Sequence, residues 1–378
     1  MNRNNIETVN IKQLNRQKVY QFIYHQKQTS KQELVQNLGL GLSTVSQNLT
    51  QLEQDGLIER TGAFQSTGGR KAQIIQIVPE FKIAIGVGIL KNMLHLVSVN
   101  LYGEVLGTET IPLKYTETSE YYHTAAESIV KFIHSNGYYP EQILGISIAT
   151  QGIISPDGTS VTYSAVMNNA SMKLYDFADR LPYPCRLEHD SKSAAYLELW
   201  SHPDLDSALV FLLNRNLGGA VITHHHVHQG LSFHSGCLEH ICIDPAGPLC
   251  YCGNHGCLET YCSANSLEAA SGMNIKDFFS ELENSENQKV NSIWNQYLEH
   301  LAFAIRNLNM MFDSPVIISG YLAPYFTDEI LDKLLLLINS ATPFPLERKN
   351  LMAGSHGQYT PAIGAALHYV NHFLKSEI

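Results

Sequence analysis

The sequence predicts an α/β protein in which an N-terminal winged helix-turn-helix module, residues 1–80, precedes a two-lobed body, residues 81–378. Two observations carry this prediction: helical patterns followed by a two-stranded hairpin fill the first 80 residues, and strands alternate with helices afterwards. A chain of 378 residues also exceeds the ~150 residues of one typical domain. Its 44% hydrophobic and 16% charged residues exclude a disordered or fibrous chain.

Charge is distributed unevenly along the chain. Residues 1–80 carry nine Lys or Arg and six acids, a net +3, whereas the whole chain carries −10 and the other 298 residues therefore −13. A basic head on an acidic body favours a nucleic-acid contact at the N-terminus. No apolar run approaches the roughly 18 residues of a membrane helix, and the start lacks a signal-peptide core. We therefore expect a cytoplasmic protein without membrane insertion.

Three helices are expected in the N-terminal module. Residues 14–24 have an amphipathic pattern, and Ser30 with Glu33 forms a capping box that starts a second helix. That helix should end at the glycines of 39–41, and Ser43 is expected to cap a third helix. The predicted inner face of the third helix has the i, i+4, i+7 spacing and consists of Val45, Leu49 and Leu52.

Two helices joined by a short glycine turn indicate a helix-turn-helix, whose second helix fits the major groove. Small polar and amide side chains can read base edges there. The candidate contacts on this helix are Ser43, Thr44, Ser46, Gln47, Asn48 and Gln51. Strands at 56–60 and 73–78 form a hairpin, whose tip can contact phosphates or the minor groove through Gly68, Gly69, Arg70 and Lys71. A small helical protein-interaction domain with an exposed hairpin is the alternative; the order of cap, turn, polar face and basic tip favours DNA.

The body shows buried strand patterns interleaved with helices. This alternation predicts an α/β body, and its length suggests two lobes with a ligand cleft between them. The expected elements are strands at 83–89, 93–100, 105–111, 143–149, 208–213 and 316–319, a hairpin through 219–232, and helices at 121–135 and 292–312.

Seven cysteines, an odd number in a chain without a secretory signal, argue against a disulfide framework. Three thiols within eight residues, Cys250, Cys252 and Cys257, together with an imidazole match the Cys₃His set of a structural zinc site. His240 precedes the loop and His255 lies inside it, so either could be the fourth ligand. Glycines at 253 and 256 let the backbone fold back around the ion. Buried free thiols without metal are the alternative.

The run Gly-Cys-Leu-Glu-His at 236–240, followed by Cys-x-Cys-Gly-Asn-x-Gly-Cys-Leu-Glu ending at 259, resembles the signature of the ROK family. That family unites bacterial sugar kinases with sugar-responsive repressors, and the repressor branch carries a winged helix with a wing similar to residues 66–71. The resemblance extends to the ending Pro-Ala-Ile-Gly-Ala-Ala at 361–366. It implies an actin-like (ribonuclease H-like), sugar-kinase-type body with a structural zinc, Zn²⁺, held by His240, Cys250, Cys252 and Cys257.

Both phosphate loops of the family's kinases differ in this chain. Where such kinases have Asp-x-Gly-Gly-Thr, residues 88–92 read Gly-Ile-Leu-Lys-Asn, and the second loop, Gly-Thr-Gly, reads Asn-Arg-Asn at 214–216. Backbone amides must approach a phosphate closely, and side chains at those glycine positions obstruct them. We therefore expect no enzyme activity. The alternative is an active sugar kinase with an accessory DNA-binding module.

The resemblance also implies a set of ligand contacts: His189, Asp190, Cys237, His240 and Glu259. Asn169 falls in a loop before the helix expected at 175–181, and we expect it to face the cleft as a further ligand contact. Asp190 matches the family's aspartate, but His189 replaces an asparagine and Cys237 a glutamate. Losing a carboxylate and an amide should change the ligand, so the effector is expected to be an unusual sugar, a sugar phosphate or no sugar. For Asp190, an N-cap of the following helix is an equally good interpretation.

These features together predict a DNA-binding transcriptional regulator, most simply a repressor of carbohydrate-related genes. One short recognition helix reads few bases, so we expect a homodimer or tetramer on a double-stranded DNA operator. Control by a protein partner instead of a small molecule is the alternative. The histidines of 224–228 are interpreted as a solvated turn in preference to a second metal site.

Overall fold

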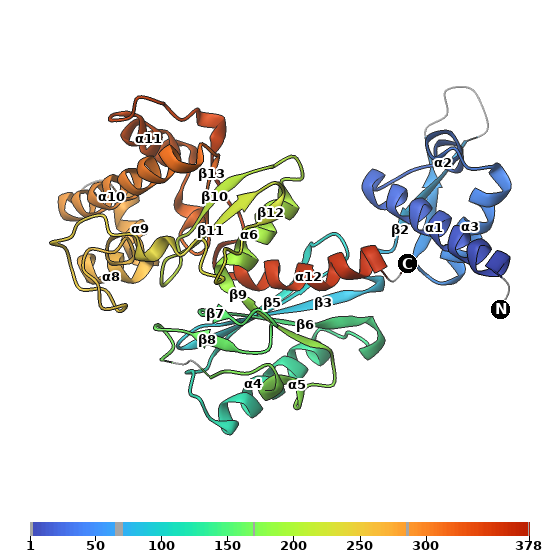
Figure 1. Cartoon of the computed structure of the whole chain (residues 1–378), viewed down its shortest axis with the longest axis horizontal. Coiled ribbons are helices and arrows are strands. Elements are labelled where there is room, and N and C mark those ends of the chain that lie inside the picture. The colour runs from blue at the N-terminus through green and yellow to red at the C-terminus, as the bar shows by residue number, and fades with distance from the viewer. Residues whose placement is uncertain (1–2, 65–70, 169–170, 285–286, 377) are drawn as a thin grey trace.

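The computed structural model describes residues 3–64, 71–168, 171–284, 287–376 and 378. It confirms the predicted fold class: a module of three helices and a two-stranded hairpin is followed by an α/β body with two five-stranded sheets (Figure 1). Four predicted contacts, Gly68, Gly69, Arg70 and Asn169, lie outside the described residues.

The N-terminal module consists of α1 (Arg3–Gln26), α2 (Lys31–Leu38), α3 (Leu42–Gln54), β1 (Ile58–Ala63) and β2 (Gln73–Ile77). The predicted capping box is confirmed: the Glu33 amide donates to Ser30 Oγ (3.3 Å), and the Ser30 amide donates to Glu33 Oε2 (2.8 Å). The cap predicted at Ser43 is wrong, because α3 begins one residue earlier, at Leu42. Gly41 takes the N-cap with an extended backbone, and no side chain caps the helix. The predicted inner face, Val45, Leu49 and Leu52, is buried.

The first sheet of the body has the order β5-β4-β3-β6-β9. Its strands are β3 (Ile83–Ile89), β4 (Met93–Val99), β5 (Val105–Pro112), β6 (Ile143–Thr150) and β9 (Cys185–His189). Helix α4 (Ser119–Ser135) and the short α5 (Tyr175–Ala178) pack against one side, and α12 (Thr360–Ser376) lies on the other (Figure 1). A small ribbon of β7 (Ile153–Ile154) and β8 (Val161–Tyr163) follows β6.

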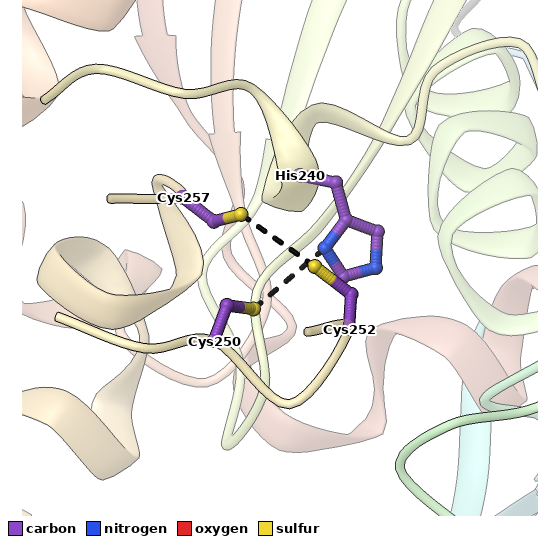
Figure 2. A group of neighbouring side chains, drawn as sticks. All are labelled: His240, Cys250, Cys252 and Cys257. Carbon is purple, nitrogen blue, oxygen red and sulfur yellow. Dashed lines mark hydrogen bonds between the residues drawn. The ribbon is translucent and has the colours of Figure 1, made fainter. Parts of the chain in front are cut away.

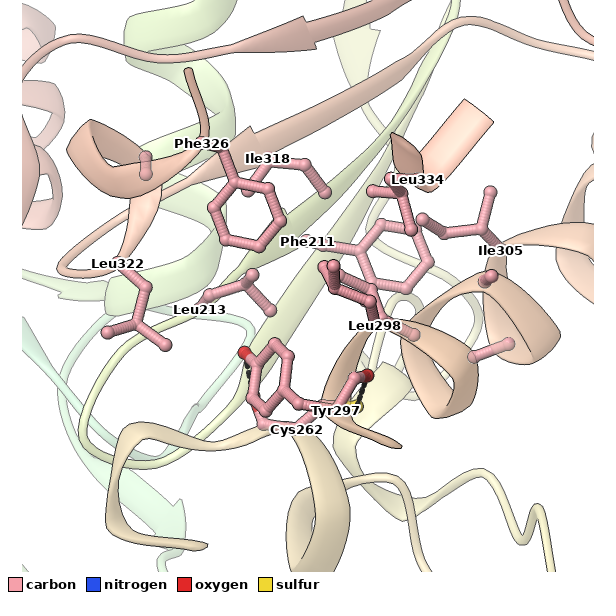
Figure 3. Close-up of a cluster of buried hydrophobic side chains, with 14 of the residues drawn as sticks. Phe211, Leu213, Cys262, Tyr297, Leu298, Ile305, Ile318, Leu322, Phe326 and Leu334 are labelled. Carbon is pink, nitrogen blue, oxygen red and sulfur yellow. Dashed lines mark hydrogen bonds between the residues drawn. The ribbon is translucent and has the colours of Figure 1, made fainter. Parts of the chain in front are cut away.

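The second sheet has the order β12-β11-β10-β13-β14. Its strands are β10 (Ala208–Leu212), β11 (Gly218–Thr223), β12 (His226–Val227), β13 (Val316–Ser319) and β14 (Leu351–Ala353). Five helices gather around this lobe: α7 (Glu259–Cys262), α8 (Ala264–Ser271), α9 (Ile275–Glu283), α10 (Gln288–Phe312) and α11 (Asp328–Asn339). Figure 3 shows part of the core between sheet and helices, where Phe211, Leu298 and Phe326 pack together.

Helix α6 (Asp190–Ser201) packs directly on α12, between the two sheets. The contact is unusually close at Gly364, where an added Cβ would stand 1.8 Å from the Ser193 carbonyl oxygen. The helices can therefore touch only because residue 364 has no side chain.

The N-terminal module shares a hydrophobic core with the body. Val19 and Ile23 of α1 belong to the same buried cluster as Leu101, which follows β4, and Phe373 of α12. Two hydrogen bonds join the same segments: Tyr24 Oη donates to the Leu101 carbonyl (3.0 Å), and Gln17 Nε2 donates to a backbone carbonyl of α12, at residue 375 (2.6 Å). Over the described ranges, no helix is both long and apolar enough to cross a membrane.

Candidate functional site

A cavity of about 450 Å³ lies between the lobes. It is formed where β6 and β9 end, where α6 begins, and by the segments around residues 164, 217 and 239. Apolar walls alternate with polar groups, and the polar lining includes Gln151, His189, Asp190, Asn216, Glu239 and His240. A concave site with a few convergent polar groups is typical of small-molecule binding.

His189 and Asp190 stand at the start of α6. His189 is the N-cap, and its Nδ1 accepts a hydrogen bond from the Ser191 amide (3.2 Å). Asp190 is the first helical residue, so its interpretation as the N-cap is wrong; its Oδ1 also accepts from the Ser191 amide (2.7 Å). Burial lowers the pKa of His189 to about 3 and raises the pKa of Asp190 to about 6. His189 is therefore neutral at pH 7 and presents no positive charge to a ligand.

Glu239 lines the cavity, although the sequence reasoning did not select it. Its Oε2 is buried and has no hydrogen-bond partner among the described residues. Burial, and after it the nearby carboxyl groups of Asp190 and Glu259, raise the pKa of Glu239 to about 8. One feature of the sequence could have indicated that Glu239 lies at the cavity: it is adjacent to His240 and two residues after Cys237, and both of these residues line the cavity.

Glu259, a predicted ligand contact, is buried but does not line the cavity. Its two carboxylate oxygens accept hydrogen bonds from Asn216 Nδ2 (2.8 Å) and the Leu217 amide (2.6 Å). Glu259 thus holds the loop at residues 214–217, which forms one wall of the cavity.

The predicted metal ligands come together beside this cavity (Figure 2). Cys252 Sγ lies 3.7 Å from Cys257 Sγ, and Cys250 Sγ lies 3.8 Å from His240 Nδ1. A tetrahedral ion with Zn–S bonds of about 2.3 Å places two sulfurs about 3.8 Å apart, so these residues fit zinc. All four ligand atoms lie within 4.8 Å of one another, and the group could hold a metal ion.

His255, the other candidate imidazole, is not in this group. Its Nδ1 forms a hydrogen bond with the Gly247 carbonyl (2.9 Å). The loop folds back at Gly256, where φ is +64° and an added Cβ would stand 1.6 Å from the Asp244 carbonyl oxygen. The backbone therefore requires glycine at that position.

The two segments at the positions of the kinase phosphate loops line one small cavity. The space between them, lined by Gly88, Leu90 and Asn214, has a volume of about 10 Å³. A single water needs about 10–15 Å³, so the cavity has no room for a phosphate group in the conformation described. Arg215 is engaged elsewhere: its Nη1 donates to Glu268 Oε2 (2.7 Å), and its guanidinium lies 5.3 Å from the centre of the Tyr321 ring.

The predicted DNA-contacting side chains differ in accessibility. Ser43, Gln47 and Gln51 are exposed, whereas Thr44, Ser46 and Asn48 are half-buried. Asn48 Nδ2 donates to the Thr44 carbonyl (2.8 Å), which removes one of its donors from base reading. Gln47 and Gln51 share a groove with Lys12 and Arg16 of α1. At the hairpin tip, Lys71 is exposed.

The histidine-rich segment at 224–228 joins β11 to β12. His224 and His225 occupy the turn with φ of 51° and 59°, and both are exposed. Within the described ranges, His240 and its three cysteines are the only group of three or more side chains placed to hold a metal ion. The structure thus places His224 and His225 in an exposed turn, as expected.

Comparison with protein families matches residues 82–371 to the ROK family. The DNA-binding transcriptional dual regulator NagC of Escherichia coli K12 is 28% identical over 263 residues, which cover 68% of this chain and 64% of that regulator. The match thus spans just under two thirds of that relative's length. The xylose repressor of Bacillus subtilis 168 is 22% identical over 373 residues, covering 96% of this chain and 97% of the repressor.

Solved structures share the fold. A ROK family transcriptional regulator, a homologue of the E. coli MLC protein, superimposes with a TM-score of 0.72 at 19% identity, over 96% of this chain and 98% of its own. A ROK family glucokinase from Streptomyces griseus, in complex with glucose and AMPPNP, has a TM-score of 0.65 at 19% identity, over 76% of this chain and 98% of its own. Repressors are thus among the similar proteins over nearly the full length, and kinases over the body.

Proposed function

The chain belongs to the ROK family, and on that premise we propose that it is a DNA-binding transcriptional regulator, most simply a repressor of carbohydrate-related genes, whose interlobe cavity binds a small-molecule effector. The observation that carries the proposal is the combination of three N-terminal helices and a hairpin with a body whose phosphate-loop positions border a cavity of only about 10 Å³. The names of two relatives, a transcriptional dual regulator and a xylose repressor, support the same function. We propose the cytoplasm as its compartment and a homodimer or tetramer as its DNA-bound form.

Loss of phosphoryl transfer is part of this proposal. Nucleotide phosphates need a glycine-lined cradle, and the space at Leu90 and Asn214 is too small for one. Incubation with ATP and a panel of hexoses is expected to give no sugar phosphate above the buffer blank, measured by coupled release of ADP. Turnover that depends on both the sugar and the protein would contradict the proposal and favour a kinase.

We further propose that zinc is the metal and that its role is structural. Three thiolates and an imidazole close the coordination sphere and leave no open position for a substrate. The ion would fasten the segment 240–257 and thereby fix His240 and Glu239 against the cavity.

Helix α6 supplies a direct route from the cavity to the winged helix. Its first residue, Asp190, lines the cavity, and the helix extends about 15 Å from there to Trp200. Trp200 Nε1 donates to the Tyr102 carbonyl (3.0 Å), and the Tyr102 ring stacks on Tyr24 of α1, with ring centroids 5.1 Å apart. A ligand that binds more tightly when α6 is in one position than in another would favour that position, and with it one placement of the winged helix. The ratio of the two affinities sets the size of this population shift.

Trp200→Phe tests this route, because it keeps a ring but removes the donor to Tyr102. The effect of the ligand on operator affinity is expected to fall roughly threefold to tenfold, the size of one lost hydrogen bond. The measurement is the ratio of DNA affinities with and without the effector, by fluorescence anisotropy. Trp294→Phe is the matched control, since Trp294 lies in the other lobe and its Nε1 has no hydrogen-bond partner among the residues that the structure describes. An unchanged ratio in Trp200→Phe would exclude the route.

DNA binding is tested by selection from a random duplex library, followed by variants in the winged helix. Gln47→Ala is expected to weaken the free energy of binding to the selected sequence by about 1–3 kcal/mol and to reduce the preference for one base pair. Lys71→Ala should weaken binding to all DNA sequences by the same factor. It should also reduce the slope of log affinity against log salt concentration by about one.

Lys276→Ala is the control for charge, because Lys276 is exposed on α9. No enrichment of any sequence, together with binding that does not depend on salt, would contradict the proposed function.

A further inference from the structure

A second cavity of about 450 Å³ lies beside α6. Among the described residues it shares only His189 with the interlobe cavity. Its walls come from β9 of the first sheet, from residues 225–227 at the edge of the second sheet, and from the turn after β7 (Figure 1). Helix α6 contributes one face, with the i, i+4, i+7 spacing of Lys192, Tyr196 and Leu199. The second cavity thus touches both lobes and the helix between them.

Positive charge exceeds negative charge on the walls of the second cavity. Arg186 and Lys192 are its cations, and Glu188 is the only carboxylate among the lining residues that are described. Arg186 Nη2 forms an ion pair with Glu188 Oε1, so the charge of Lys192 is left over. His368 adds no charge at pH 7, because burial, and after it the charge of Arg186, lower its pKa to about 3.

Lys192 is held in place without being neutralised. Its Nζ donates to Gln229 Oε1 (2.7 Å) and to the Phe233 carbonyl (2.9 Å), and both acceptors are uncharged. An ammonium group has three donors, so one remains for a ligand. Burial lowers the pKa of Lys192, because removal from water disfavours the charged form. An oxyanion would offset this cost, since charge-assisted hydrogen bonds are about twice as strong as neutral ones.

The other acidic residues near the second cavity do not face it. Asp157, in the turn after β7, accepts hydrogen bonds on Oδ1 from Ser155 Oγ and from the amide and hydroxyl of Thr159. Asp206 lies beside His225, with Oδ1 3.9 Å from Nε2. Neither aspartate lines the cavity. Within the described part of the chain, Glu188 is therefore the one carboxylate that a bound anion would meet.

Much of the remaining wall is apolar or aromatic. Tyr196 and Leu199 of α6 face Val227 and Phe233 across the space that these residues line. The Tyr196 ring stacks on His368, with ring centroids 4.1 Å apart. A volume of about 450 Å³ is within the range of small-molecule sites and exceeds the size of a free phosphate ion. The walls therefore suit a ligand that has an apolar part as well as a charged one.

We propose that this second cavity binds a small anion with a phosphate or carboxylate head, held by Lys192 and Arg186, and an apolar or aromatic body. Arginine suits both heads, because its planar fork can donate two parallel hydrogen bonds to either. This inference goes beyond the proposed function, which places an effector in the interlobe cavity and assigns nothing to the second one.

The test is calorimetric titration of the full-length protein with two matched pairs of probes: phenyl phosphate against phenol, and 3-phenylpropionate against 3-phenylpropanol. At least one anion is expected to bind with a dissociation constant below about 1 mM and roughly tenfold or more tightly than its neutral parent. The pair with the larger ratio shows whether the head is a phosphate or a carboxylate.

Two variants with opposite expected effects locate the binding. Lys192→Met keeps the length of the side chain but removes its charge, and should weaken the anion roughly tenfold without changing the neutral parent. Glu188→Gln removes the carboxylate and frees Arg186, and should strengthen the anion roughly threefold or more. Lys276→Met, at an exposed position on α9, is the control for charge and should change neither affinity.

No binding of either anion below about 1 mM, or equal binding of the neutral parents, would overturn the proposal. So would an unchanged anion affinity in Lys192→Met or a weakened one in Glu188→Gln, with the melting temperature showing that each variant is folded. A gain of affinity cannot come from a damaged fold, so Glu188→Gln decides if Lys192→Met does not fold. The DNA selection described above is independent: anion binding without DNA binding would leave this inference standing and remove the proposed function.

Discussion

Gly364→Ala is expected to destabilise the protein by roughly 3 kcal/mol or more and to lower its melting temperature by roughly 5–10 °C. The added methyl group would stand 1.8 Å from the Ser193 carbonyl oxygen, so α6 and α12 must move apart. The sign of the change in unfolding free energy is informative, because without a clash alanine in a helix interior stabilises by about 1 kcal/mol relative to glycine. A destabilised variant therefore identifies the clash as the dominant effect.

Differential scanning calorimetry on the purified variant measures the change. Gly41→Ala is the control: its backbone has φ of −61° and the nearest atom to an added Cβ is 3.9 Å away, so its cost should stay under about 1 kcal/mol. Because α6 begins in the cavity, Gly364→Ala should also change the effect of the ligand on DNA affinity. A variant as stable as the wild type would mean that the two helices are not in close contact.

Cys252→Ser should have the second large effect, through loss of the metal. The protein as purified is expected to contain one zinc per chain, and the variant much less than one, measured by plasma mass spectrometry. Structural zinc contributes about 10–16 kcal/mol in small zinc-binding peptides, so removal of one of four ligands should lower the melting temperature by roughly 10 °C or more. A strong chelator should reproduce the change in the wild type.

Cys242→Ser provides the control for this experiment. Cys242 is exposed, lies in the same segment, and donates from Sγ to the His255 carbonyl (3.4 Å), but it is outside the ligand group. Its loss should leave both the zinc content and the melting temperature unchanged. A folded wild type without metal, whose melting is insensitive to the chelator, would contradict the assignment.

Local patterns predicted the local structure well. The Ser30 capping box follows from spacing within a few residues, and the structure reproduces it. The cysteine spacing likewise predicted that Cys250, Cys252 and Cys257 lie close together, because all three thiols lie on one short loop, and with His240 they form a group that could hold a metal ion. Ser43 was misassigned as a cap because its side chain has the right chemistry, while Gly41 offers a favourable backbone. Helix α1 starts at Arg3, well before the predicted start at residue 14.

Features that depend on distant segments could not be predicted in this way. Glu239 has a polar side chain in a loop, and only the three-dimensional arrangement shows that its Oε2 is enclosed without a partner. Glu259 was predicted to contact the ligand, but the loop at 214–217 folds against it, and both of its carboxylate oxygens accept hydrogen bonds from that loop. The contact of Gly364 with Ser193 joins residues that are far apart in the chain, so no local pattern reveals it.

The common core of α1, Leu101 and Phe373 has a practical consequence for anyone who wishes to dissect the protein. A fragment that stops near residue 80 would leave the apolar sides of Val19 and Ile23 in water, and it should aggregate or melt well below the intact chain. The N-terminal module and the body are therefore not independent folding units. A chimera that joins this N-terminal module to another body would also need the turn between β4 and β5 and helix α12, because these segments cover its apolar side.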